Sequence, residues 1–254
     1  MDDKIQELSR QIEELRATAQ PSKMITLPMA IVLAGVLIAG SVTYASILYR
    51  NGNAAALRDP AGDAAQEVAD IRPVAADDHI FGDQNALVKI VEYSDTECPF
   101  CKRFHQTMRR IMVTYGADGR VAWVYRHLPL SQLHAQAPVE AHAAECADEI
   151  GGNNAFWKYI NILFDITPSN DGLDLAQLPV IAQDAGLDPA KFDECMQSDK
   201  RVDRIISNAK EAADAGIQST PYSVVFTPKG KRLVINGAQS YETVREIIEQ
   251  ALND

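Results

Sequence analysis

The sequence is short of positive charge and of cysteine. It has 24 Lys and Arg residues against 35 acidic ones, which gives a net charge of −11 and a pI near 4.9. That balance argues against nucleic acid, and against an anionic membrane surface, as the ligand. There are four cysteines and only one C-x-x-C pair, so the two close pairs that commonly hold a structural zinc ion are missing. The sequence shows no internal repeats.

Charge is absent altogether from one long stretch near the N-terminus. No charged residue lies between Lys23 and Arg50. Residues 24–49 are therefore long enough to cross a bilayer, which takes roughly 20 apolar residues at about 1.5 Å rise each. A cleaved signal peptide is the alternative, since residues 43–45 loosely resemble a cleavage site. The run exceeds the usual apolar region of such peptides, roughly 7–15 residues, so the sequence predicts an uncleaved signal anchor.

The flanking segments set the orientation of this span. Residues 1–23 carry four Lys or Arg residues, and only Arg50 and Arg58 follow closely after the span. The bias predicts a single pass through the cell membrane, with a cytoplasmic N-terminus and an extracytoplasmic C-terminal part. Residues 1–23 are expected to form a juxtamembrane helix, with a short dimerising coiled coil as the alternative. Residues 50–79, rich in Ala and Asp, are expected to be a flexible linker, with a helix packed on the domain as the alternative.

Residues 80–254 are long enough for one domain with a sizeable core. Branched, alternating residues predict strands at 86–95 and 120–130, and between them a basic amphipathic helix at 99–115. Further helices are expected at 137–151, 154–164, 175–185, 189–197 and 201–215, within an insert that spans about 131–215. Two strands around a Pro-Lys-Gly turn and a helix capped by Ser240 complete the domain. This order predicts an α/β protein with a thioredoxin fold and a helical insertion.

The C-x-x-C pair stands where the first expected strand meets the first expected helix. A zinc site lacks a second close pair, although His105, one helical turn later, adds a possible ligand. A structural staple that closes so short a loop gains little chain entropy. Disulfide exchange fits the position better, because Cys98 begins a helix with Pro99 at its first position, where unpaired N–H groups and the helix dipole favour a thiolate. Cys101, one turn deeper, is suited to be the resolving thiol.

An ordered set of motifs adds a resemblance. "CPFC" after a strand, then "YRHLPL", "AAECA", a late Thr-Pro and "NGAQSYETVREIIEQAL" follow one another as in the DsbA-like thiol–disulfide oxidoreductases. The chain resembles that family from about residue 80 to residue 253, and within it the membrane-anchored branch. The resemblance implies an enzyme that introduces disulfides into exported proteins with free cysteines. It further implies a membrane redox partner that reoxidises the pair, and neither a cofactor nor a metal ion.

The resemblance also implies roles for single residues. Cys98 matches the nucleophilic cysteine and Cys101 the resolving one. Glu92 matches a buried acid that relays a proton to the resolving thiol, with a solvated strand charge as the alternative. Pro221 matches a cis-proline that faces the cysteine pair and, with Thr220, binds substrate; an ordinary trans turn proline is the alternative.

The second pair of cysteines is assigned by the resemblance as well. Cys146 and Cys195 match a pair found in part of the family, and this implies a structural disulfide inside the insert. Two free buried cysteines, which behave as small apolar residues, are the alternative.

The sequence departs from the strongest oxidants of the family at the pair itself. Phe100 replaces a histidine before the second cysteine and offers neither a hydrogen-bond donor nor a charge. Asp95 and Glu97 oppose a thiolate, whereas Lys102 and Arg103 favour it. The departure puts the oxidising strength of the pair in question.

The direction of electron flow therefore stays open at this point. Thr220 before the proline also occurs in the isomerase branch of the family, so a disulfide isomerase or reductase is one alternative. A non-catalytic module that binds copper or a client protein through its thiols is the other.

Overall fold

Residues 6, 10–11 and 69–254 are described in the computed structural model of the chain. The expected span at 24–49, nearly all of the expected juxtamembrane helix, and the linker up to residue 68 lie outside the described residues. Within the part that is described, no helix combines the length and the apolar character that a membrane crossing needs.

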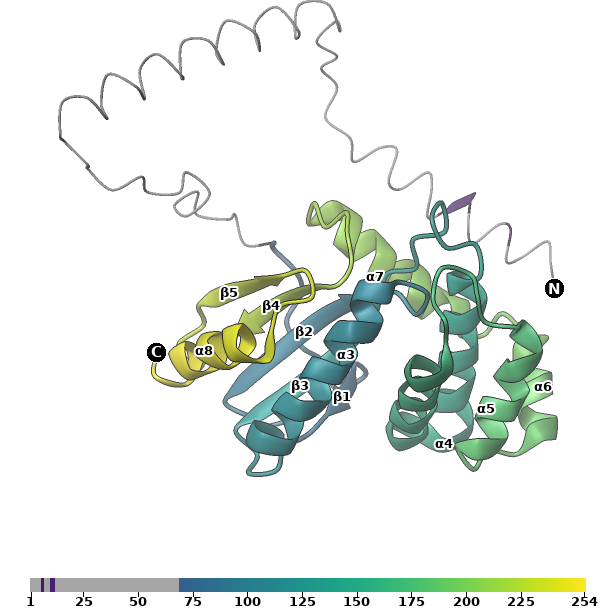
Figure 1. The fold of residues 1–254 in the computed structure, drawn as a ribbon, viewed down its shortest axis with the longest axis horizontal. Coiled ribbons are helices and arrows are strands. Elements are labelled where there is room, and N and C mark those ends of the chain that lie inside the picture. Colours follow the sequence, from purple (N-terminus) through teal and green to yellow (C-terminus); the bar gives the residue numbers. More distant parts are fainter. Residues whose placement is uncertain (1–5, 7–9, 12–68) are drawn as a thin grey trace, which may run out of the picture. The chain divides into compact units, whose positions relative to one another are not determined.

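A five-stranded sheet lies at the centre of residues 69–254 (Figure 1). Its strands are β1 (His79–Phe81), β2 (Val88–Ser94), β3 (Val121–His127), β4 (Tyr222–Phe226) and β5 (Arg232–Asn236). The spatial order is β1-β3-β2-β4-β5, in which β2 and β3 are parallel and every other neighbouring pair is antiparallel. The parallel pair is the expected β-α-β unit. Strand β1 has only three residues and was not expected from the sequence.

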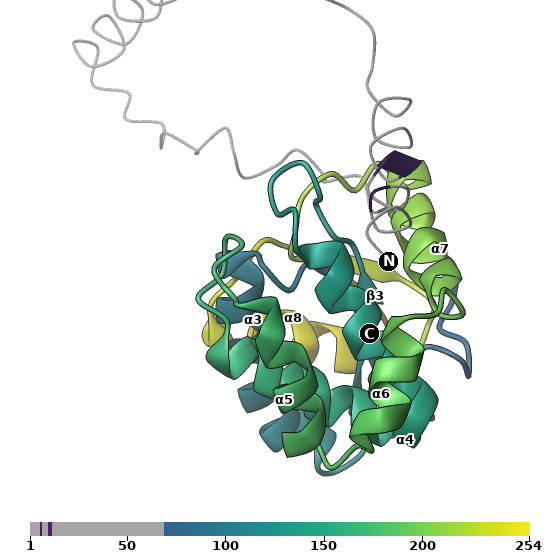
Figure 2. The same cartoon turned by 90° about the vertical axis from the view of Figure 1, so that its right-hand side faces the viewer.

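The helical elements of the domain, in chain order, are α3 (Pro99–Ile111), followed by a π-helical turn (Met112–Gly116), α4 (Ala137–Ile166), a 3-10 turn (Leu175–Gln177), α5 (Leu178–Asp184), α6 (Pro189–Met196), α7 (Val202–Asp214) and α8 (Tyr241–Leu252). Helices α4, α5 and α6 gather at one side of the sheet, and Figure 2 views the domain from that side. The chain therefore has the thioredoxin fold with a helical insertion between β3 and β4.

Helix α4 contains a kink. The two helices expected at 137–151 and 154–164 are present, and α4 joins them across Gly152, whose backbone is not helical. Gly152 has φ 69°, a left-handed conformation that glycine adopts at little cost. The Gly-Gly pair in the sequence therefore marks the kink at which the two expected helices meet.

Strand β2 contributes to both faces of the sheet because its side chains alternate. Val88 and Ile90 lie in the core that includes α3 and α8, whereas Val91 and Tyr93 lie in a second core that includes α7. Glu92 has the same parity as Ile90. Its carboxylate therefore points to the face covered by α3, the helix that carries the cysteine pair.

The last part of the expected linker belongs to the domain, which corrects the boundary at residue 79. Ile71 is buried, and Arg72 forms two hydrogen bonds to the carboxylate of Asp78, at 2.7 and 2.9 Å. Arg126 of β3, fully buried, binds the same carboxylate. Burial alone would raise the pKa of Asp78, but the hydrogen bonds from Arg126 and Arg72 lower it to about 2. These charge pairs order residues 69–79, although their composition is typical of a linker.

The Arg126 cluster gives a stability prediction. Arg126→Ala leaves Asp78 and Glu211 without their buried partner, and we expect a loss of about 3–5 kcal/mol in the free energy of unfolding. Arg232→Ala is the matched control, because its partner Asp70 is 96 % exposed and such pairs contribute about 1 kcal/mol or less. Urea unfolding of the full chain, followed by tryptophan fluorescence, measures both. Equal losses would contradict the assignment.

Candidate active site

Cys98 occupies the N-cap of α3, at the end of the turn that follows β2. Its backbone is extended, Pro99 fills the first helical position, and no acidic residue lies in the first turn. The first N–H groups of a helix have no partner within the helix and carry a partial positive charge. The strand-to-helix junction therefore surrounds the Cys98 sulfur with groups that favour an anion.

The two cysteines differ sharply in their tendency to ionise. Both are free thiols here and both are buried. A hydrogen bond from the Cys101 thiol, and further ones from the backbone N–H groups of Cys101 and Phe100, lower the pKa of Cys98 from 9.0 to about 6 against the effect of burial. Burial, followed by the interaction with Cys98, raises the pKa of Cys101 well above 9.0. At neutral pH, Cys98 is therefore a thiolate and Cys101 a thiol.

The loop before β4 places the expected Thr-Pro pair against Cys98. The Thr220–Pro221 bond is cis, and the Thr220 carbonyl oxygen lies 3.6 Å from the Cys98 sulfur, where it can accept a hydrogen bond while Cys98 is protonated. The backbone N–H of Gly237 donates to the Pro221 carbonyl at 3.0 Å, which ties this loop to the end of β5. Residues more than a hundred positions apart in the sequence thus meet at one sulfur atom.

Glu92 is fully buried, as its alternation with Val91 and Tyr93 predicted. The indole N–H of Trp123 donates to Oε2 at 2.9 Å, and Oε1 has no hydrogen-bond partner among the described residues. Burial raises the pKa of Glu92 to about 7, and its negative charge contributes to the raised pKa of Cys101. The carboxyl group can therefore gain or lose a proton near neutral pH. Its role as a relay to Cys101 stays a prediction.

Asp95 has a partner that the sequence gave no reason to expect. Its carboxylate accepts hydrogen bonds from the backbone N–H of Leu130 at 2.7 Å and from Nδ1 of His134 at 2.9 Å. Its own backbone N–H donates to the Cys101 sulfur at 3.5 Å. The acid that was expected only to oppose a thiolate is thus paired with an imidazole. No local motif marks His134, because only the fold brings together residues 39 positions apart.

Glu97, next to the nucleophile in sequence, is also buried and engaged. Its carboxylate accepts hydrogen bonds from the Thr167 hydroxyl at 3.3 Å and from the backbone N–H of Asp171 at 2.7 Å. Burial, and then the neighbouring carboxylate of Glu97, raise the pKa of Glu140 to about 10. Glu140 is therefore neutral at pH 7, which limits the negative charge around the pair.

His105, the possible extra ligand one helical turn after the pair, faces the core from α3. It is buried, forms a hydrogen bond with Asn161 at 2.7 Å and stacks on Phe164 with 4.5 Å between ring centroids. Burial lowers its pKa to about 4, so the ring is neutral. The residue packs α3 against α4, and its ring also lies against Trp123 of β3, with 4.9 Å between ring centroids.

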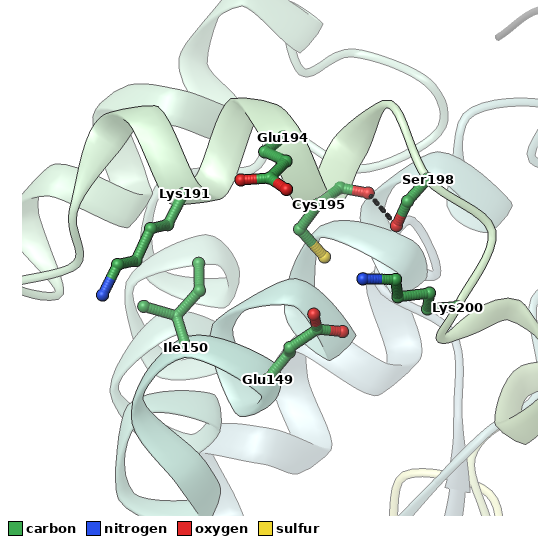
Figure 3. Close-up of a pocket in the computed structure, with 7 residues that line it drawn as sticks. All are labelled: Glu149, Ile150, Lys191, Glu194, Cys195, Ser198 and Lys200. Atoms are coloured by element: carbon green, nitrogen blue, oxygen red, sulfur yellow. Dashed lines mark hydrogen bonds between the residues drawn. The ribbon is translucent and has the colours of Figure 1, made fainter.

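The second pair of cysteines forms a disulfide between α4 and α6, from Cys146 to Cys195. His142 lies 3.7 Å from the Cys146 sulfur, but a bonded disulfide offers no thiolate to a metal ion. A pocket of about 290 Å³ lies beside Cys195 (Figure 3), whose sulfur points toward Glu149 and Lys200. The other lining residues are Ile150, Lys191, Glu194 and Ser198. Neither cysteine of the C-x-x-C pair lines it.

A second group of metal-ligating types joins β1, β3 and α4. Nε2 of His79 and Nε2 of His127 lie 2.7 and 3.1 Å from the same oxygen of Glu145. The guanidinium of Arg204 lies 3.4 Å from the other oxygen and already supplies a positive charge. These contacts describe a buried polar network that joins the insert to the sheet, and its carboxylate already has a positively charged partner in Arg204.

Comparison with known proteins agrees with this geometry. A family model described as "Thioredoxin" matches residues 75–250. Among solved structures, Pseudomonas aeruginosa DsbA2 is 29% identical, with a TM-score of 0.59 over 72% of this chain and 98% of that one. Oxidised BdbD from Bacillus subtilis has a TM-score of 0.64 at 21% identity, over 74% and 99% of the two chains. Wolbachia pipientis α-DsbA1 has a TM-score of 0.61 at 21% identity, over 70% and 92%.

The curated relatives are much longer proteins. The Na⁺/H⁺ antiporter NhaA 3 of Salinispora tropica is 35% identical over 161 residues, which are 63% of this chain and 23% of the antiporter. The NhaA 1 antiporter of Mycolicibacterium vanbaalenii is 34% identical over 154 residues, which are 59% and 24%. The chain thus spans about a quarter of the length of the curated relatives it matches.

These findings define the class of protein. The chain belongs to the thioredoxin family, and its fold together with the Cys98–Cys101 pair makes it a DsbA-like thiol–disulfide oxidoreductase.

The disulfide of the insert gives a second stability prediction. It closes a loop of 49 residues, for which the chain-entropy treatment gives about 4 kcal/mol. We expect the double variant Cys146→Ser/Cys195→Ser to lose stability of that order in urea unfolding of the full chain. Mass spectrometry after alkylation of the unreduced, unfolded protein checks the bond itself. Alkylation of both cysteines in protein made outside the cytosol would contradict it.

Proposed function

We propose that the chain is a membrane-tethered, extracytoplasmic oxidase that introduces disulfides into exported proteins. The observation that carries the proposal is the asymmetry of the pair, with Cys98 at a helix start and a pKa of about 6, and Cys101 buried with a raised pKa. A thiolate is stabilised only in the reduced pair. The reduced form is therefore favoured, which makes the disulfide form an oxidant.

The proposed thiol–disulfide exchange takes place in two steps, in each of which a client thiolate attacks a sulfur atom. A client thiolate attacks the Cys98 sulfur of the oxidised pair, the Cys98–Cys101 bond breaks, and Cys101 leaves and takes a proton. Glu92, with a pKa of about 7, is the proposed source of that proton. A second client thiolate then attacks the client sulfur of the mixed disulfide and releases Cys98 as a thiolate. The client has lost two electrons, which the cysteine pair holds.

The strength of the oxidant follows from the same pKa. The pKa of the attacking cysteine is about 3.5 in the strong oxidant DsbA and about 7 in thioredoxin. A value of about 6 places this pair between them. We therefore propose a reduction potential between roughly −120 and −270 mV.

The tether and the partners rest on other observations. Residues 24–49 carry no charge, and Lys and Arg are more frequent before them than after them. The curated relatives are named as Na⁺/H⁺ antiporters, a kind of protein that works in a membrane. We propose that a membrane redox partner reoxidises the pair, that exported proteins with reduced cysteines are the clients, and that the two cysteines act without a cofactor.

Isomerase or reductase activity is the second candidate. The observation in its favour is Thr220, which precedes the cis-proline and whose carbonyl oxygen lies 3.6 Å from the Cys98 sulfur. A module that only binds copper or a client has less support, because a buried acid such as Glu92 is not needed where no proton is transferred.

The roles of the two cysteines can be tested by trapping. Cys101→Ser removes the resolving thiol, so mixed disulfides with clients should accumulate on Cys98 and appear on non-reducing gels. Cys98→Ser is the matched control and should trap none. Equal trapping by both variants, or faster alkylation of Cys101 than of Cys98 at neutral pH, would show that the roles are assigned wrongly.

The oxidising strength can be tested at Phe100, which is half exposed beside the pair. Phe100→His adds a hydrogen-bond donor near the Cys98 thiolate, so we expect the reduction potential to rise by roughly tens of millivolts, 30 mV being about 1.4 kcal/mol for two electrons. Equilibration with glutathione buffers measures the potential, and Phe100→Leu serves as the uncharged control. An unchanged or lower potential in the histidine variant would contradict thiolate stabilisation as its determinant.

A further inference from the structure

An imidazole is held beside the cysteine pair by the acid of the active-site turn. We propose that His134 is a positioning residue for thiol exchange, whose positive charge offsets Asp95 and so keeps the Cys98 thiolate favourable. This inference deepens the proposed function, because it rests on Cys98 as the attacking thiol.

The geometry places Asp95 in contact with both cysteines. Its backbone carbonyl accepts from the Cys98 N–H at 3.2 Å, and its backbone N–H donates to the Cys101 sulfur at 3.5 Å. Its side chain is buried, and its negative charge contributes to the raised pKa of Cys101. A carboxylate in this position destabilises the Cys98 thiolate. A positive charge that offsets the carboxylate therefore favours the reaction.

His134 is more than a structural ligand of that carboxylate. Backbone N–H groups of Glu97 and Leu130 already donate to Asp95, at 2.8 and 2.7 Å, so the carboxylate is held without the imidazole. Among the described residues, His134 adds the only hydrogen-bond partner of this carboxylate that can carry a positive charge, through Nδ1 at 2.9 Å. Three groups that can carry a negative charge act electrostatically on the ring: Asp95 after β2, Cys98 at the start of α3, and Asp171 in the loop after α4.

These groups decide when His134 is charged. The hydrogen bond to Asp95 raises the pKa of His134 above 6.5, and the charges of Asp95, Cys98 and Asp171 act in the same direction. The imidazolium is therefore present below this raised pKa and is lost as the pH rises through it. Below that pH the charge of Asp95 is offset, whereas above it Asp95 opposes the Cys98 thiolate without compensation.

The consequence is that the contribution of His134 to client oxidation is larger at lower pH, where its imidazole is charged. A client dithiol supplies two electrons and releases two protons when it reduces the Cys98–Cys101 disulfide. One proton goes to Cys101, and Cys98 remains a thiolate. Because this new negative charge raises the pKa of His134, part of the second proton is taken up by its imidazole and the rest goes to the solvent.

The test compares charge with hydrogen bonding at one position in the full chain. His134→Asn keeps a donor near the place of Nδ1 but cannot carry a charge, and His134→Lys restores a charge that does not titrate in this range. Gln132→Asn, at an exposed site of the same loop, is the control. The alkylation rate of Cys98 is measured at pH 6 in a Cys101→Ser background. The equilibrium constant for oxidation of glutathione by the Cys98–Cys101 disulfide is measured at pH 6 and 8.5 in the chain that keeps both cysteines.

We expect His134→Asn to lower the alkylation rate and the equilibrium constant at pH 6 by about three- to tenfold, tenfold being one pKa unit. The ratio of the parent's equilibrium constant to that of His134→Asn should be smaller at pH 8.5 than at pH 6, because the imidazole loses its charge as the pH rises through its raised pKa. His134→Lys should recover most of the loss at pH 6. The proposal is overturned if His134→Asn matches the parent at pH 6, if the ratio is the same at both pH values, or if lysine does not rescue.

Failure of the proposed function has a different signature. If Cys98 in the Cys101→Ser chain alkylates no faster at pH 6 than Cys101 in the Cys98→Ser chain, the assignment of Cys98 as attacking thiol is wrong. A reactive Cys98 that is indifferent to His134 overturns only the role of the histidine.

Discussion

A thiolate at the start of α3 has to stay charged inside a site that excludes most water, and the surrounding structure follows from that requirement. The helix end and the Cys101 thiol supply hydrogen bonds to the Cys98 sulfur, which lower its pKa to about 6 although burial opposes the charge. The Cys101 thiol can donate because burial keeps it protonated. The two cysteines are therefore one unit, in which the neutrality of the second maintains the charge of the first.

The helical insert takes part in this arrangement through the segments that border it. The segment between β3 and α4 brings His134 to Asp95, and the segment after α4 brings Thr167 and Asp171 to Glu97. Both acids of the active-site turn thus receive their partners from outside the β-α-β unit. An insert that appears in the sequence as a mere interruption of the fold completes the electrostatics of the site.

Local sequence patterns predicted those features of the site that depend on residues close together in the chain. The proline after Cys98 was sufficient to place a thiol at a helix start, and the alternation around Glu92 favoured its burial, which the structure shows. Trp123 and His134 could not be found in this way, because their contacts with Glu92 and Asp95 join residues 31 and 39 positions apart. The boundary at residue 79 was missed for a related reason, since the order of that segment depends on the long-range pair between Asp78 and Arg126.

The two cysteine pairs of the chain show how position within a helix separates redox chemistry from structural support. Cys98 precedes the first turn of α3, where the helix dipole favours a thiolate, whereas Cys195 lies in the last turn of α6, where the dipole opposes one. Cys146 lies fully buried within α4, with no unpaired backbone N–H groups beside it. Reduction of the second pair would thus create thiols that neither helix helps to ionise. A disulfide at the start of α3 is therefore suited to thiol exchange, whereas the disulfide between α4 and α6 is suited to permanent cross-linking.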